Sequence, residues 1–174
     1  AVCLQDKGDG TICKNVKMLS YQDTYYSNNN GGKYYWEDSE IHGTVDFLCG
    51  GGDVYYNRCK FVVEKRSADG KGGCTIAAPY TDGSKWGYVM NECVVDNYAE
   101  TFNYGRAWGG TPRLAYLNTT LLQPDMIIKD RFTVGGMNVP ADKFVECNTM
   151  DAQGNVVSPA SNVLKFTKDN KVNE

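Results

Sequence analysis

The sequence predicts an all-β protein built as a parallel β-helix, a solenoid whose strands stack from one coil to the next. Two observations lead to this prediction, namely the residue balance and an internal repeat. Valine occurs 16 times against 8 leucines, and the 174 residues also include 12 tyrosines, 19 glycines and 15 asparagines. Branched and aromatic residues suit pleated, half-buried surfaces, whereas glycine and asparagine supply turns.

The repeat is a short sequence pattern centred on a small or sulfur-bearing residue. An apolar residue stands four positions before this residue, and another apolar residue stands two positions after it. The small-residue positions are Val16, Ser39, Cys59 and Cys93. Four positions before them stand Ile12, Tyr35, Tyr55 and Val89, and two positions after them stand Met18, Ile41, Phe61 and Val95. A looser fifth copy spans residues 116–121. The longest interval contains the polar, glycine-rich segment 64–73, which we interpret as a loop insertion.

A β phrase that recurs every 20 to 25 residues is typical of one solenoid coil, whereas a β-sandwich has irregular repeats. We expect matching positions to stack in ladders in the interior. Residues 1–5 read as strand without a preceding cap, so we expect the chain to belong to a longer protein. The phrase fades after Gln123. We therefore assign residues 1–122 to coils that carry the active site, and residues 123–174 to a C-terminal coil and cap of the same domain.

Composition excludes several classes of function. The net charge is −3 and no long basic run occurs, which argues against a nucleic-acid partner. The sequence contains no stretch of about 18 apolar residues, so it predicts no membrane-spanning helix. The seven cysteines are odd in number and lack a Cys-x-x-Cys pair, so we favour buried free thiols over one disulfide. His42, the single histidine, is interpreted as a surface or turn residue, and we expect no metal site.

Two aspartates hold the same phase in consecutive coils. Asp23 follows Val16 by seven residues, and Asp46 follows Ser39 by seven residues. Their backbones should be neighbours, about 4.8 Å apart. Two stacked carboxylates repel, so one pKa should rise, which suits one ionised nucleophile and one protonated general acid. The alternative is a pair of exposed turn aspartates, although apolar or aromatic neighbours surround both positions in the sequence.

Around these aspartates the sequence resembles the pectinesterase (pectin methylesterase) family. The motifs are residues 21–24 (YQDT), 43–50 (GTVDFLCG) and 105–108 (GRAW), in the family's order and approximate spacing. Residues 1–4 (AVCL) look like the family's Gln-Ala-Val-Ala-Leu segment entered one residue late, and residues 88–93 (YVMNEC) resemble a further family coil. The likeness covers about residues 1–122.

The resemblance implies a right-handed parallel β-helix that acts on methyl-esterified homogalacturonan (pectin) without metal or cofactor. It also implies the site residues. Asp46 resembles the family's nucleophile and Asp23 its general acid/base. Gln22 resembles an oxyanion donor, and Arg106 resembles the guanidinium that holds the nucleophile. Trp108 resembles a sugar platform, and Tyr26 and Val45 match positions that line the groove.

The sequence departs from the family pattern at three places. Ala107 stands where the family has proline, and Cys49 replaces an aromatic residue after the nucleophile, which removes an expected sugar contact. The glutamine that should precede Ala1 would be a second oxyanion donor, and its loss can cost about 10²–10³ in rate. We therefore expect this chain to be the C-terminal part of a longer catalytic domain.

Two other functions remain open at this stage. One is a related β-helix esterase that acts on another acyl ester, and the other is a non-catalytic polysaccharide-binding solenoid. The pectinesterase reading implies a secreted or periplasmic enzyme, because its polymer substrate is extracellular. We expect a monomer.

Overall fold

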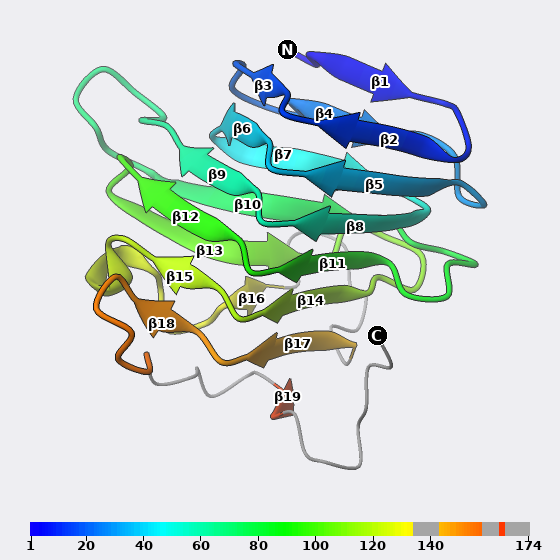
Figure 1. The fold of residues 1–174 in the computed structure, drawn as a ribbon. Coiled ribbons are helices and arrows are strands. Elements are labelled where there is room, and N and C mark those ends of the chain that lie inside the picture. Colours follow the sequence, from blue (N-terminus) through cyan, green and yellow to red (C-terminus); the bar gives the residue numbers. More distant parts are fainter. Residues whose placement is uncertain (134–142, 158–163, 166–174) are drawn as a thin grey trace.

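The computed structural model describes residues 1–133, 143–157 and 164–165. Each coil adds one parallel strand to each of three sheets, here called A, B and C, which wrap around a common core (Figure 1). The predicted all-β, right-handed parallel β-helix is confirmed. Among the described residues, no helix has the length and apolar character needed to cross a membrane.

The three sheets follow the chain in rotation. Sheet A contains β1 (Leu4–Asp6), β4 (Tyr25–Ser27), β7 (Val45–Gly50), β10 (Gly73–Pro79), β13 (Thr101–Arg106) and β16 (Phe132–Thr133). Sheet B contains β2 (Thr11–Lys14), β5 (Lys33–Glu37), β8 (Asp53–Asn57), β11 (Tyr88–Asn91), β14 (Leu114–Leu117), β17 (Phe144–Cys147) and β19 (Leu164–Lys165). Sheet C contains β3 (Lys17–Met18), β6 (Glu40–Gly43), β9 (Lys60–Val63), β12 (Val94–Asn97), β15 (Thr120–Leu121) and β18 (Met150–Asp151), and a short 3₁₀ helix, η1 (Pro124–Met126), follows β15.

The predicted small-residue ladder is present at the start of sheet C. The carbonyls of Val16, Ser39, Cys59 and Cys93 each accept a hydrogen bond from the backbone N–H that begins the next coil's sheet C strand. Ser39, Cys59 and Cys93 are buried, and Val16 packs against the core. The ladder continues through Thr119 to Thr149, beyond the point where the sequence phrase fades. Strands β16, β17 and β18 thus extend all three sheets, while the division at residue 122 stays a prediction.

The apolar residues four positions before the small-residue ladder form a second ladder, which lies on the outside of the solenoid. The expectation that all matching positions face the interior is therefore wrong. Ile12, Tyr35, Tyr55 and Val89 are in register across sheet B, but Ile12 is 66% and Tyr55 38% exposed. Side chains alternate between the two faces of a strand. The neighbours of this ladder, such as Trp36 and Tyr56, therefore fill the core, where Trp36 packs on Tyr25 with ring centroids 4.7 Å apart.

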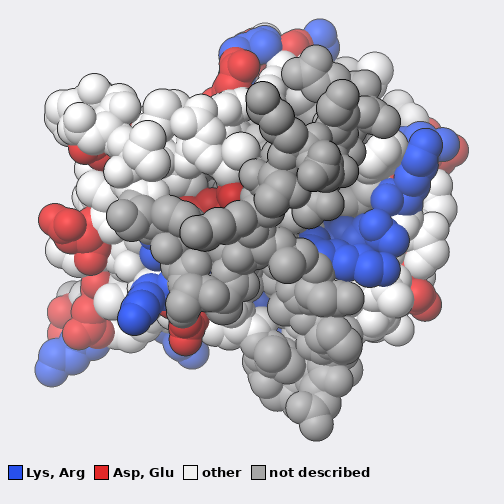
Figure 2. All heavy atoms as spheres, turned by 90° about the horizontal axis from the view of Figure 1, so that it is seen from below, with Lys and Arg blue, Asp and Glu red and all other residues white. Residues whose placement is uncertain are grey.

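The C-terminal end of the described solenoid contains charges of both signs. Inside the last coil, Arg131 Nε lies 3.4 Å from a Glu146 oxygen, and the Thr149 hydroxyl donates to the same carboxylate at 2.6 Å. On the surface, Figure 2 shows basic side chains gathered mainly at the right of the view and acidic side chains mainly at the left. The described part of this face thus carries both signs of charge, in keeping with the small net charge.

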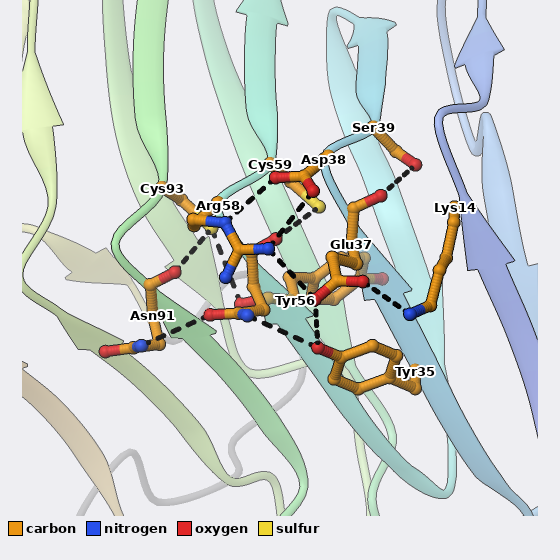
Figure 3. Close-up of polar contacts among 11 residues, drawn as sticks. Lys14, Tyr35, Glu37, Asp38, Ser39, Tyr56, Arg58, Cys59, Asn91 and Cys93 are labelled. Atoms are coloured by element: carbon orange, nitrogen blue, oxygen red, sulfur yellow. Dashed lines mark hydrogen bonds and ion pairs between the residues drawn. The ribbon is translucent and has the colours of Figure 1, made fainter.

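The corner between sheets B and C has the same backbone shape in every described coil. Its left-handed residues, with φ between 48° and 56°, are Asn15, Asp38, Arg58, Glu92, Asn118 and Asn148. Figure 3 shows how polar side chains join successive corners. Arg58 donates to Asp38 and to Glu37, each at 2.9 Å, and Lys14 pairs with Glu37 at 2.6 Å. Lys14, Tyr35 and Arg58 hydrogen-bond to Glu37 and lower its pKa to about 2.

The cysteines, His42 and segment 64–73 can each be compared with the sequence-based expectations. All seven cysteines are free thiols, four of them buried. His42 lies within strand β6 rather than in a turn, and its two ring nitrogens contact Glu64 at 2.6 Å and Glu40 at 2.5 Å. Segment 64–73 runs between β9 and β10 and enters β10 at Gly73, as the loop interpretation predicts.

Candidate active site

Asp23 and Asp46 occupy equivalent corners where the chain enters sheet A. Strand β4 pairs with β7 at an offset of 23 residues, which also separates the two aspartates. The Asp23 N–H donates to the Val45 carbonyl at 3.3 Å, so the pairing extends to this corner. Both aspartates have φ of 53°. A left-handed conformation is uncommon for residues other than glycine, and strain of this kind clusters at functional sites.

A β-bulge in β7 directs the Asp46 side chain. Val45 pairs with Thr75 and Leu48 with Ala77, so three steps along β7 match two along β10. An extra residue of this kind bends a strand and re-aims a side chain. Phe47 fills the core, and a β-carbon at Gly43 would lie 2.1 Å from that of Phe47. Glycine at position 43 is therefore required for the bulge to pack.

Arg106, the last residue of β13, binds the Asp46 carboxylate through two nitrogens. Its Nε lies 2.9 Å from Oδ1 and 3.1 Å from Oδ2, and Nη2 lies 2.6 Å from Oδ2. Asp46 is only 5% exposed, and the hydrogen bond to it raises the pKa of Arg106. This geometry holds an ionised carboxylate in one orientation.

Asp23 has a different electrostatic environment from Asp46. Burial raises the pKa of Asp23, and the neighbouring charge of Asp46 raises it further. The Cys49 thiol and Arg106 act in the opposite direction without reversing the rise. The two carboxyl groups therefore differ in their surroundings: the guanidinium binds Asp46 directly, while the pKa of Asp23 is raised.

An aromatic cluster stands beside the acidic pair. The half-buried ring of Trp108 meets the edge of Tyr26 at 6.1 Å and the edge of Tyr80 at 5.7 Å between centroids. Tyr26 belongs to β4, and Tyr80 directly follows β10 and is 36% exposed. Aromatic rings that are partly exposed offer flat apolar faces to a ligand.

The remaining predicted residues lie next to the aspartates in the chain. Gln22 is exposed and precedes Asp23, and the half-buried Val45 precedes Asp46. The structure thus brings Asp23, Asp46 and Arg106 together, and Tyr26 and Trp108 together. The role of each of these residues, and of Gln22 and Val45, stays a prediction.

Sequence reasoning missed Tyr80 and one property of Cys49. Pro79 pairs with Gly50, so counting coils forward from β7 would have placed Tyr80 at the end of the same sheet. Cys49 was recognised as a lost aromatic contact, but not as a buried thiol whose pKa is raised by burial and by the nearby carboxylates of Asp23 and Asp46. In the described part of the chain, no group of three histidine, cysteine or acidic side chains is placed to bind a metal ion.

Comparison with known protein families matches residues 1–137 to the family model described as Pectinesterase. The chain belongs to the pectinesterase family. A pectinesterase of Sitophilus oryzae is 29% identical over 150 residues, which are 79% of this chain and 38% of that protein. Pectinesterase B of Dickeya dadantii is 29% identical over 147 residues, covering 75% of this chain and 34% of that protein.

Solved pectin methylesterase structures share the fold. One, described as a complex with hexasaccharide VII, is 27% identical with a TM-score of 0.74, covering 95% of this chain and 55% of that chain. Pectin methylesterase PemA from Erwinia chrysanthemi is 26% identical, with the same TM-score and the same two coverages. The predicted family membership is confirmed. The chain spans between a third and two fifths of the two curated pectinesterases, and about half of each solved structure.

Proposed function

We propose that the protein to which this chain belongs is a pectin methylesterase, a carboxylic ester hydrolase that removes methyl esters from homogalacturonan. The observation that carries the proposal is the asymmetry of the two aspartates. Arg106 binds the Asp46 carboxylate directly through two nitrogens, while Asp23, its register neighbour, has a raised pKa. Two adjacent carboxyl groups with different protonation states supply a nucleophile and an acid in one site.

In the first half of the reaction, an Asp46 oxygen attacks the carbonyl carbon of the methyl ester. The carbonyl oxygen becomes an oxyanion, to which the Gln22 amide donates a hydrogen bond. As the intermediate collapses, the bond to the methoxy oxygen breaks and Asp23 transfers its proton to that oxygen. Methanol leaves, and an anhydride joins Asp46 to the galacturonate carboxyl.

In the second half, water attacks the galacturonate carbonyl of the anhydride. Asp23, now a carboxylate, takes a proton from this water, and the Asp46 carboxylate departs. The product is a galacturonic acid carboxyl group, which loses its proton to the solvent, and both aspartates return to their starting states. Arg106 keeps the leaving Asp46 carboxylate ionised and oriented throughout.

The pectin chain lies across the outer face of sheet A. Trp108 presents its ring to a pyranose, braced by Tyr26 and Tyr80, and Val45 lines the groove beside the nucleophile. All of these residues come from one chain, so the proposed site needs no second subunit, and we expect a monomer. Because the polymer cannot enter a cell, the protein is secreted or lies in the periplasm or cell envelope.

The test measures methanol released from methyl-esterified pectin by the complete protein and by its Asp46→Asn and Asp23→Asn variants. Each should lose activity by roughly 10⁴-fold or more. Asp38→Asn is a matched control, because Asp38 is also left-handed and accepts a bond from an arginine Nε at 2.9 Å. It should keep nearly full activity, since it lies at the corner between sheets B and C.

Two alternative functions give different results in the same experiment. An enzyme that hydrolyses other acyl esters, but releases no methanol from pectin at any pH, would keep the site and change the substrate. Pectin binding without turnover would identify a non-catalytic solenoid. Substantial activity in Asp46→Asn would show that the nucleophile is assigned wrongly.

A further inference from the structure

We propose that the outer face of sheet B is a second binding surface, separate from the two aspartates, and that its ligand is an uncharged polysaccharide. Sheets A and B lie on different sides of the solenoid, so a polymer bound to sheet B leaves the candidate active site accessible (Figure 1). This inference goes beyond the proposed function and does not depend on it, because binding to sheet B can be measured without any esterase activity.

An apolar row forms the floor of this surface. It consists of register neighbours on successive strands, which lie outside the core cluster, namely Ile12, Tyr35, Tyr55 and Val89. The rings of Tyr35 and Tyr55 stack with their centroids 5.9 Å apart and their planes 6° from parallel, so each ring holds the other in one orientation. A groove of about 770 Å³ lies over this row. Ligand-binding clefts are typically about 300–1,000 Å³ in volume and lined mostly by apolar and aromatic side chains.

One side of the groove is formed by Trp86, whose backbone is held in place by the neighbouring coils. The Asp53 carboxylate accepts hydrogen bonds from the N–H groups of Trp86 at 2.6 Å and of Gly87 at 2.8 Å. A β-carbon at position 87 would lie 2.5 Å from that of Arg113, and φ there is 70°, so this turn requires glycine. The Trp86 side chain is nevertheless 42% exposed. An exposed indole on a fixed backbone offers a ligand a flat apolar surface and one N–H donor.

A row of asparagine side chains borders the groove on the side of the corner between sheets B and C. The Asn118 amide donates to Asn91 at 3.2 Å, and the Asn91 amide donates to Asn57 at 3.3 Å. Figure 3 shows this row at Asn91. An amide has two N–H groups and an oxygen with two lone pairs, and these bonds use one N–H and one lone pair of Asn91. Asn91 and Asn118 line the groove, so their remaining hydrogen-bonding capacity can serve the hydroxyl groups of a ligand.

The charges of the groove determine which ligand fits it. Among the described residues that line it, the charged ones are Lys33 and Asp53, one of each sign, and Asp53 already binds two backbone N–H groups. A polyanion such as polygalacturonate needs a surface with excess positive charge, which this groove does not provide. Aromatic surfaces and amide groups suit the apolar ring faces and hydroxyl groups of a neutral sugar. Because the apolar row repeats at about 4.8 Å with each coil, it favours a ligand that is a linear polymer.

The test measures binding of the complete protein to soluble polysaccharides by affinity electrophoresis. The neutral polymers are xyloglucan, mixed-linkage β-glucan and galactan, and polygalacturonate is the charged comparison. At least one neutral polymer should retard the wild-type protein. Trp86→Ala should raise the Kd for that polymer by roughly 3- to 10-fold, the effect of losing one aromatic contact, and Tyr55→Ala should raise it as well.

Trp108→Ala is the matched control, because Trp108 belongs to the aromatic cluster beside the aspartates. It should leave binding of the neutral polymer unchanged. Trp86→Ala should release methanol from soluble pectin at the wild-type rate, because Trp86 lies outside the candidate active site. The thermal unfolding midpoint of each variant checks the fold, and if Tyr55→Ala does not fold, the exposed Trp86 decides the test alone.

The outcomes separate this inference from the proposed function. Neutral-polymer binding that weakens in Trp86→Ala, without methanol release from any sample, would support the second surface and overturn the proposed function. Methanol release without retardation by any neutral polymer would overturn the second surface alone. Equal weakening in Trp108→Ala would also overturn it, because the polymer would then bind beside the aspartates. A dimer in sedimentation that Trp86→Ala dissociates would overturn it too, since a second copy of the chain would then occupy the groove.

Discussion

Replacing Arg106 with lysine tests how the candidate active site holds Asp46, the proposed nucleophile. Arg106 makes three contacts of 2.6 to 3.1 Å with the two oxygens of Asp46. A lysine keeps the charge but offers a single point donor, so at least one charge-assisted hydrogen bond is lost. Such a bond is worth about 1.5–3 kcal/mol. If the bond acts fully in the transition state, kcat/KM should fall by roughly 10- to 100-fold.

The assay is initial-rate methanol release from methyl-esterified pectin, with the thermal unfolding midpoint measured on the same samples. Arg58→Lys is the matched control, because Arg58 also binds carboxylates through two nitrogens but lies at the exposed corner between sheets B and C. It should leave kcat/KM within about twofold. An Arg106→Lys enzyme as active as the wild type would refute the reasoning, since the planar fork would then contribute nothing to catalysis.

Two other predictions concern substrate binding and acid stability. Trp108→Ala should raise KM roughly tenfold with a smaller effect on kcat, because an aromatic contact of about 1–1.5 kcal/mol is lost from bound substrate. Tyr80→Ala should raise KM less, and both effects are measured from pectin saturation curves. An unchanged KM in both variants would exclude the aromatic cluster as a sugar platform. Glu37 has a folded pKa of about 2 against an ordinary value of 4.5, so its ionised form stabilises the fold above pH 4.5 and this contribution is lost as the pH falls through 2. The difference in unfolding midpoint between wild type and Glu37→Gln should therefore shrink between pH 6 and pH 2, and a constant difference would argue against the corner network.

The solenoid could be predicted from the sequence because the spacing of the repeat reflects the length of one coil, whose strands stack on those of the next coil. A position such as Cys59 faces the same interior in each coil, so small residues recur there and reveal the register. The outer ladder containing Ile12 and Tyr55 was misplaced for a related reason. Apolar residues on the outer face of sheet B follow the same period as core residues, and hydropathy alone does not distinguish the two faces.

The coil count also placed Asp23 beside Asp46, and the resemblance supplied Arg106 from 60 positions further along the chain. Other features could not be predicted in this way. The bulge at Asp46 depends on the pairing between β7 and β10, and the bracing of Trp108 by Tyr80 depends on how two loops meet. Such contacts arise from the three-dimensional path of the chain, so no single stretch of sequence encodes them.

Backbone conformation gives an independent reason to locate function at Asp23 and Asp46. A left-handed residue occupies the corner between sheets B and C in six coils of the described chain, and these residues are as different as Arg58 and Asn118. The left-handed conformation at that corner is therefore an architectural requirement of the solenoid. Asp23 and Asp46 adopt the same strained conformation where the chain enters sheet A. The described chain shows no other non-glycine residue with positive φ at that corner, so the coil architecture does not impose it there. Strain of this kind costs about 1 kcal/mol or more at each residue and persists where surrounding contacts enforce it. At Asp46 those contacts are the bulge, the packing of Phe47 and the hold of Arg106, which together fix the carboxylate that the proposed mechanism uses as the nucleophile.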